Sequence, residues 1–265
     1  MGDTPENGKT SAASPAGAGP LEGLRRFTAA RIGLPRSGAS LATGPLLDFR
    51  LAHARARDAV HDELDSARLA AEVTPLGLPV LEVASAADTQ QSYLTRPDLG
   101  RRLADAATRT LQAATGERTF DAVFVVADGL SARAVQAHAA SLLALTVPEL
   151  ARDGWDLAPF AIVRHGRVAI GDAIAGILRA NLAIVLIGER PGLSAPDSMG
   201  AYLTWQPSPA TTDAERNCIS NIRPDGIPYA DAAFKLLHLM RAMRAQKLSG
   251  VRLKDDSERL LIEQR

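Results

Sequence analysis

The sequence contains a single cysteine, Cys218, among its 265 residues. One cysteine excludes both an intramolecular disulfide framework and a zinc site made from several cysteines. The histidines do not form a metal site either, because they are scattered and no two stand at the spacing of metal ligands. The five are His53, His61, His138, His165 and His238. We therefore expect no metal site in this chain.

A net charge is also missing. The 30 basic side chains of Lys and Arg balance 30 acidic ones, so no global field attracts nucleic acid or an anionic membrane. The sequence has no run of about 18 consecutive apolar residues, and so it gives no sign of a membrane span. The N-terminus lacks the charged and then apolar segments of a secretory signal. A cytoplasmic location is expected.

The residues that are present form an ordinary globular composition, with 46% hydrophobic and 23% charged residues. Residues 1–20 are small and polar, and we expect a disordered tail there. Residues 21–75 are rich in arginine and contain a helical run from Pro45 to Leu69. This run fits a solvated helix face, which is the simpler interpretation, or a docking arm for a larger partner. Residues 76–265 have the pattern of an α/β domain.

Short strands and helices alternate within residues 76–265. Phe120–Ala127 and Leu182–Ile187 are continuous apolar runs, typical of parallel strands buried on both faces. Pro228–Gln246 is the longest expected helix of this domain. The other expected elements are the strands Leu78–Val83 and Phe160–Arg164, the loop Tyr93–Pro97, and the helices Asp98–Ala114 (capped by Asp98), Ser131–Leu145 and Asp172–Leu178. The pattern predicts an α/β fold with a mainly parallel, Rossmann-like sheet covered by helices, and an N-terminal helical extension.

The loop Asp128–Ser131 follows the first of the two strong strands. In parallel sheets, ligands bind beyond the carboxyl ends of the strands. Gly129 suits a positive φ and a close approach of the backbone to a ligand, and Ser131 is placed to cap the next helix. This motif fits a plain capped turn as well as it fits a ligand loop.

The loop Gly188–Ser194 follows the second strong strand. Glu189 and Arg190 put two charges directly after six apolar residues, where partners or a ligand must offset the loss of solvation. A surface ion pair is the simpler alternative, but the position at a strand end favours a ligand role.

A third polar segment, Thr211–Ile222, has the composition of a loop. Its short side chains can make several hydrogen bonds to a ligand or to the backbone. Cys218 lacks a histidine nearby in the sequence, so we do not expect it to act as a nucleophile.

Recognisable catalytic motifs are absent from these loops. The sequence has no G-x-G-x-x-G fingerprint after a strand, no G-x-x-x-x-G-K-[ST] phosphate loop and no G-x-S-x-G nucleophile elbow. Loops suited to a ligand without acid–base machinery indicate a binding subunit. We therefore assign no catalytic residue.

Four segments in order along the chain carry a family resemblance. They are Tyr93–Arg102, Asp128–Ser131, Gly188–Leu193 and Cys218–Ile222. Together they closely resemble the small (light) subunit of ethanolamine ammonia-lyase, and the similarity extends from about Arg25 to Leu253. Any one segment is weak, but the ordered set is specific.

The resemblance implies a subunit of a carbon–nitrogen lyase that is inactive alone. The family's enzyme uses adenosylcobalamin to convert ethanolamine into acetaldehyde and ammonia by a radical route. A large barrel subunit holds ethanolamine and most catalytic groups, while the small α/β subunit contacts the cobalamin from the other side. Six large and six small subunits are expected in the complex.

The resemblance also implies three cobalamin contacts in this chain. They are Val168 in Arg167-Val168-Ala169, Glu189 in the Gly188–Gly192 segment, and Cys218 in Cys218–Ile222. Glu189 suits the amide side chains of the corrin, Val168 an apolar edge of the corrin or its nucleotide base, and Cys218 a backbone or weak thiol contact. No histidine stands in a D-x-H-x-x-G pattern, so base-on binding is expected.

Some family members carry an amphipathic leader that directs packaging into a bacterial microcompartment. Residues 1–20 are too small and polar for such a helix, so packaging stays an open alternative to a free cytoplasmic enzyme. Two other classes of function also stay open. One is a stand-alone α/β enzyme with Glu189 or Asp128 as general base, and the other is a structural scaffold in which Glu189 and Arg190 merely pair.

Overall fold

The computed structural model describes residues 21–28 and 30–257. By its internal contacts the chain divides into two compact units, with the boundary between Ala54 and Arg55. The expected disordered tail, residues 1–20, lies outside the described residues. The first unit contains the 3-10 helix η1 (Glu22–Phe27), the short strands β1 (Arg36–Ser37) and β2 (Ser40–Leu41), and the start of helix α1 (Thr43–His61).

The prediction of one continuous helix over Pro45–Leu69 is wrong. Helix α1 ends at His61, and a second helix, α2 (Ser66–Val73), begins after a short break. The Asp65 side chain accepts a hydrogen bond from the Arg68 N–H at 2.9 Å and caps α2. This aspartate starts a new helix, which the spacing of apolar residues alone did not show.

The second unit is built on a six-stranded sheet with the strand order β3-β5-β4-β6-β7-β8. The strands are β3 (Val80–Ala84), β4 (Phe120–Ala127), β5 (Phe160–Arg164), β6 (Ala180–Gly188), β7 (Met199–Trp205) and β8 (Asn217–Ile222). The first four are parallel, whereas β7 is antiparallel to β6 and β8 is antiparallel to β7. The expected α/β fold with a mainly parallel sheet is confirmed.

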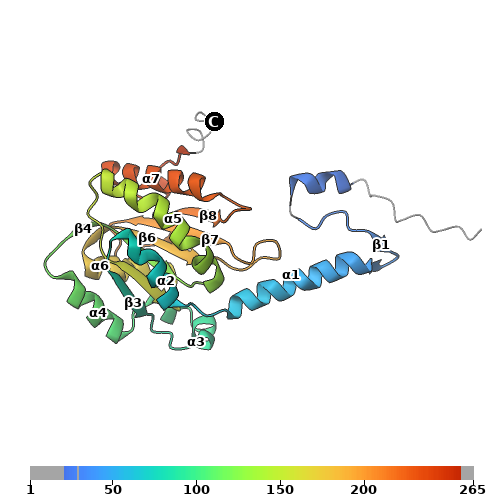
Figure 1. Cartoon of the computed structure of the whole chain (residues 1–265), viewed down its shortest axis with the longest axis horizontal. Helices are drawn as coiled ribbons and strands as arrows, with labels where there is room; N and C mark the ends of the chain where they lie inside the picture. The colour runs from blue at the N-terminus through green and yellow to red at the C-terminus, as the bar shows by residue number, and fades with distance from the viewer. Residues whose placement is uncertain (1–20, 29, 258–265) are drawn as a thin grey trace, which may run out of the picture. The chain divides into compact units, whose positions relative to one another are not determined.

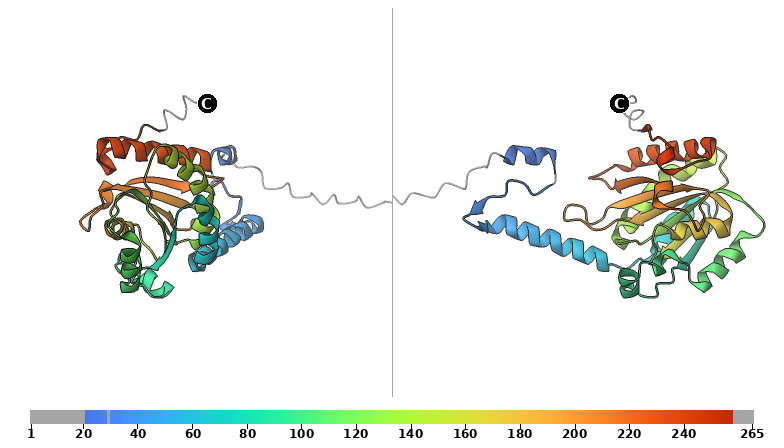
Figure 2. Two further views of the ribbon diagram at one scale, coloured as in Figure 1. Left: turned by 60° about the vertical axis from the view of Figure 1, so that its left-hand side comes forward. Right: turned by 180° about the vertical axis from the view of Figure 1, so that it is seen from behind.

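Helices cover both faces of this sheet. Strands β4 and β6 are buried almost throughout, as their continuous apolar sequences predict. Their side chains alternate between two apolar clusters, one on each face. The helices α2, α5 (Ala132–Arg152) and α7 (Tyr229–Gln246) cover one face, and α4 (Asp105–Thr115) and α6 (Ile170–Leu178) cover the other. Figures 1 and 2 show α5 with α7 on one side and α4 with α6 on the opposite side.

The expected helices at the end and middle of the domain are confirmed with shifted bounds. The inner face of α7 is buried as expected, at Ala232, Ala233, Leu236, Leu237, Met240 and Met243. Helix α5 continues to Arg152 instead of ending near Leu145. Val147 and Leu150 extend its buried stripe, and this packing outweighs the low helix propensity of Pro148.

The segment around Asp98 was predicted wrongly. Tyr93 lies in helix α3 (Gln90–Thr95) and not in a loop. Asp98 does not cap a long helix, because its carboxylate accepts two hydrogen bonds from the Arg96 guanidinium, both at 2.9 Å. The chain then forms the 3-10 helix η3 (Leu99–Arg101) before α4 begins.

The prediction that Thr211–Ile222 is a loop is also wrong. It contains the 3-10 helix η4 (Asp213–Glu215), which Thr212 and Glu215 open with a capping box, and then strand β8. Strand β7 was not expected at all. The remaining short helices are η2 (Thr74–Leu76) and η5 (Gly250–Arg252). Among the described residues, no helix is long and apolar enough to cross a membrane.

Candidate functional site

The Asp128 carboxylate is buried and links the ends of two strands by hydrogen bonds. Its oxygens accept hydrogen bonds from three backbone N–H groups, those of Gly129 at 2.9 Å, His165 at 2.6 Å and Gly166 at 3.0 Å. Burial raises the pKa of Asp128, and the three N–H bonds oppose that rise. These bonds tie the end of β4 to the turn after β5, so the geometry supports a structural role for this side chain.

The two loops singled out from the sequence pack directly on each other. The Leu130 N–H donates to the Gly188 carbonyl at 3.0 Å. Gly129 has the positive φ expected of it, +60°, and a Cβ there would lie 2.3 Å from the Gly188 oxygen. Ser131 stands at the start of α5 but does not cap it, which corrects the prediction, because its hydroxyl donates instead to the Pro196 carbonyl at 3.1 Å. The contact leaves no room for a ligand between the loops.

Glu189 extends from the end of β6 and gathers polar partners from distant parts of the chain. Its carboxylate accepts hydrogen bonds from the Ser198 and Ser220 hydroxyls and from the Asn221 N–H, the last at 3.2 Å. Its own N–H donates to the Ser198 carbonyl at 2.9 Å. Within the described residues, hydroxyl and amide groups are therefore the partners of Glu189, and an ion pair with Arg190 is not among them.

A β-bulge directs two of these donors at Glu189. The pairing of β7 with β8 shifts register between Met199 and Ala201, and Asn221 has a positive φ of 61°. A bulge of this kind re-aims side chains and backbone groups at the edge of a sheet. Gly200 lies opposite, and a Cβ there would come within 2.9 Å of Glu189 Oε1. The bulge and the glycine together hold the carboxylate against the end of β8.

Cys218 lies on the same strand, paired with Tyr202 of β7. Neighbouring atoms shield part of the Cys218 thiol from solvent and raise its pKa, a hydrogen bond with Tyr202 lowers it, and the negative charge of Glu189 raises it; the net direction is upward. Burial also raises the pKa of Tyr202, and Cys218 and Glu189 add to this rise. The thiol thus stays protonated at neutral pH.

These residues form a polar strip, defined here as Glu189, Tyr202, Cys218 and Ser220. The helices that pack against β7 and β8 are α5 and α7, which lie on the opposite face. On the strip's own face, Cys218 and Ser220 are exposed to solvent. The strip is therefore the part of the sheet left open beside α6.

Val168 lies in the turn between β5 and α6 and is half-buried. It packs at the margin of the same apolar cluster as Tyr202, on the α6 side of the sheet. The structure thus brings Glu189 and Cys218 together through Tyr202, and it places Val168 on the same side of the sheet. Among the described residues, no hydrogen bond joins Val168 to the polar strip.

With this geometry established, comparison with known proteins is decisive. The model of the ethanolamine ammonia-lyase light chain family matches residues 18–254. The chain belongs to this family. The resemblance noted from the sequence is confirmed.

Several relatives of this light chain carry the name ethanolamine ammonia-lyase small subunit. The protein from Azotobacter vinelandii is 51% identical over 92% of this chain and 92% of its own length. The one from Pseudomonas fluorescens is 50% identical, covering 89% and 86%. The one from Xanthomonas campestris pv. campestris is 51% identical, covering 90% and 89%. The similarity runs across nearly the whole of each chain.

Sequence reasoning missed two residues of the light chain's polar strip and its surroundings. Tyr202 and Ser198 were not singled out, because strand β7 was not recognised. A signal was available in the alternation of Met199–Trp205, where Met199, Ala201 and Leu203 are buried on one face. Period-two alternation over seven residues predicts a half-buried strand.

Proposed function

We propose that this light chain is the small subunit of an adenosylcobalamin-dependent ethanolamine ammonia-lyase. With a large subunit it forms a carbon–nitrogen lyase that converts ethanolamine into acetaldehyde and ammonia, in a complex of six large and six small subunits. Membership of the family over residues 18–254 supports this proposal. The relatives named above bear the same enzyme name over almost their full length.

The observation that carries the proposal is the open polar strip. Glu189 offers a carboxylate whose Oε1 accepts, among the described residues, one hydrogen bond, from Ser220, and so retains capacity for another donor. The corrin ring bears amide side chains, which are such donors. Cys218 is exposed on the neighbouring part of the strip, and the half-buried Val168 adds apolar surface nearby. The carboxylate acceptor and the apolar surface of Val168 both fit a large, flat ligand with polar substituents.

In this proposal Val168, Glu189 and Cys218 bind and orient the cofactor, and the chain supplies no catalytic residue. Adenosylcobalamin, when bound, supplies the radical that starts the reaction. Glu189 is held in one place by three donors from two segments of the chain, so it presents a fixed acceptor to the cofactor. The large subunit would hold ethanolamine.

We also propose that residues 21–75 dock this subunit onto the large one. Several large apolar side chains of the first unit are exposed, including Phe27 at 74%, Leu47 at 57% and Leu51 at 51%. Large apolar side chains that stay exposed on one subunit are the kind of surface that a protein partner covers. The complex would work in the cytoplasm, either free or inside a bacterial microcompartment.

Co-expression of this chain with a large subunit tests the proposal. We expect the two to co-purify and to convert ethanolamine into acetaldehyde when adenosylcobalamin is added, while neither chain alone does so. Turnover by this chain alone would favour the stand-alone enzyme. A complex whose cobalamin affinity is unchanged by Glu189→Ala would favour the structural scaffold.

A further inference from the structure

A buried ion pair joins the two segments that carry Val168 and Cys218. We propose that Asp172 and Arg216 form a positioning pair, which sets the place of the Cys218 strand beside the Val168 turn and thereby the affinity for the cofactor. This inference rests on the proposed function. Neither side chain is assigned a contact with the cofactor.

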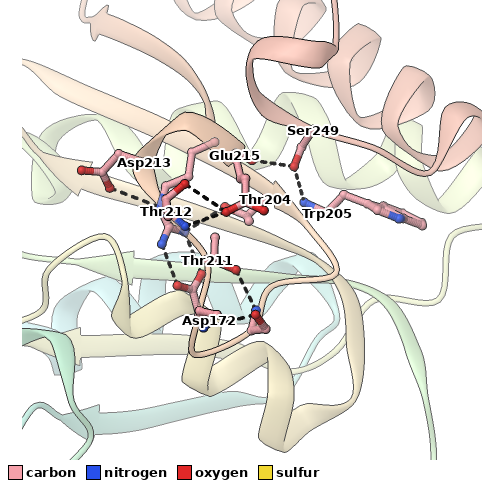
Figure 3. Close-up of polar contacts among 11 residues, drawn as sticks. Asp172, Thr204, Trp205, Thr211, Thr212, Asp213, Glu215 and Ser249 are labelled. Carbon is pink, nitrogen blue, oxygen red and sulfur yellow. Dashed lines mark hydrogen bonds and ion pairs between the residues drawn. The ribbon is translucent and has the colours of Figure 1, made fainter.

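The geometry of the pair is bidentate. Arg216 Nη1 lies 2.7 Å from Asp172 Oδ1, and Nη2 lies 2.6 Å from Oδ2. Nη1 also donates to the Thr204 hydroxyl at 3.0 Å. Figure 3 shows these contacts, with Asp172 on the helix and Thr204 on the sheet. Two parallel bonds fix both the distance and the angle between the groups, which a single bond does not.

Along the chain, the pair stands close to two of the three predicted cofactor contacts, Val168 and Cys218. Asp172 is in the first turn of α6, four residues after Val168. Arg216 directly precedes β8, two residues before Cys218, and its backbone is extended. Along an extended chain alternate side chains share a face, so Arg216, Cys218 and Ser220 lie in one row. A shift of Arg216 along or away from α6 therefore moves the polar strip with it.

Burial makes this pair an inefficient means of stabilising the fold. Arg216 and Asp172 are each only 8% exposed. Removing two charges from water costs much of what their attraction returns, so a buried ion pair is weak evidence for stability. Within the described residues, the third nitrogen, Nε, has no hydrogen-bond partner, and it lies 3.6 Å from Asp213 Oδ1. What the pair provides is directional placement of one segment against another.

Helix α6 is itself fixed against the sheet, so it can act as the reference point. A Cβ on Gly171 would lie 2.3 Å from Val185 Cγ2, which shows that the helix rests directly on β6. Asp172 follows this contact immediately in the sequence. Among the strands of the described residues, β8 is the last in the sheet, and β7 is its one neighbouring strand. The ion pair between Arg216 and Asp172 links the start of β8 to helix α6.

The test uses the complex with the large subunit and measures the adenosylcobalamin Kd, the ethanolamine KM and kcat at saturating cofactor. We expect Arg216→Lys and Asp172→Asn each to raise the cofactor Kd about tenfold, because each removes the bidentate geometry. The ethanolamine KM and kcat at saturating cofactor should stay within about twofold of the wild type. The control Arg118→Lys alters an exposed ion pair with Asp156 and should leave all three values unchanged.

A cofactor Kd within about twofold of wild type in both variants would overturn the proposal. So would a rise in the ethanolamine KM equal to the rise in the cofactor Kd, which indicates general damage to the fold. If both variants fail to assemble, Thr204→Val carries the test. It removes one bond to Arg216, and we expect the Kd to rise about threefold, whereas no rise would overturn the inference.

Glu189→Gln, measured in the same assay, separates this inference from the function on which it rests. Weaker cofactor binding in Glu189→Gln with unchanged binding in Arg216→Lys and Asp172→Asn would reject only the positioning pair. Unchanged binding in all three variants would reject the proposed cofactor site itself.

Discussion

Replacing Gly188 with alanine should lower the free energy of unfolding by about 1.5–4.5 kcal/mol. A Cβ at this position would lie 2.0 Å from the Ser131 oxygen and 2.6 Å from the Asp128 oxygen. Both are backbone atoms, so the loops after β4 and β6 must move apart. Overpacking of this kind costs about 1–3 kcal/mol. Losing the hydrogen bond from Leu130 to the Gly188 carbonyl adds about 0.5–1.5 kcal/mol.

Gly176→Ala provides a matched control for this change. It adds the same methyl group within helix α6, where a Cβ would have no atom within 4 Å. Alanine favours a helix over glycine, so this variant should gain about 0.5–1 kcal/mol. Urea unfolding followed by far-ultraviolet circular dichroism measures both, provided that the m-value is unchanged. Two results would refute the claim that the loops after β4 and β6 leave no room for a methyl group at Gly188. One is a Gly188→Ala protein as stable as the wild type, and the other is a Gly176→Ala protein as unstable as Gly188→Ala.

Three other changes test the roles of Asp128, His138 and Glu189. Asp128→Asn should lower the free energy of unfolding by about 1–3 kcal/mol, because an amide group cannot accept all three backbone bonds; equal stability in urea would contradict this. Burial lowers the pKa of His138 from 6.5, so the unfolded chain binds the proton first and stability is lost as the pH falls below about 6.5. His138→Gln should therefore show a flatter fall of Tm between pH 7 and 5.5 than the wild type, and parallel curves would argue against a buried neutral histidine. Glu189→Gln should speed the alkylation of Cys218 by iodoacetamide at pH 8, since it removes a charge that raises the thiol pKa. An unchanged rate would show that Glu189 does not influence the thiol.

The centre of the fold was predictable because its signals are local. The strands Phe120–Ala127 and Phe160–Arg164 were predicted with the bounds that the structure shows. A continuous apolar run needs burial on both faces, and a parallel strand covered by helices provides it. The inner face of α7 follows in the same way from the period of 3.6 residues.

The edge of the sheet was not predictable by the same reasoning. Strand β8 has polar residues on its open face, so Asn217–Ile222 has the composition of a loop. The role of Asp128 was equally hidden, since its strand-end position does not show that three N–H groups already occupy the carboxylate. These features depend on contacts between residues far apart in the sequence.

The candidate site lies between these two cases. Glu189 could be singled out from its place after an apolar strand. Its partners Ser198, Ser220 and Asn221 come from the next loop and from β8, and only the fold brings them together. The link from Glu189 to Cys218 through Tyr202 required the unrecognised strand β7.

Titration of the assembled complex with adenosylcobalamin tests the proposed role of Glu189 most directly. Wild type, Glu189→Gln and the control Glu149→Gln, an exposed glutamate of α5 paired with Arg152, are compared by the absorbance change of the cofactor. Loss of a charged hydrogen-bond acceptor costs about 1.5–3 kcal/mol, so Glu189→Gln should raise the Kd about tenfold or more. Glu149→Gln should match the wild type, and all three complexes should elute at the same size. Equal Kd values for Glu189→Gln and the wild type would contradict the assignment of the polar strip as the cofactor site.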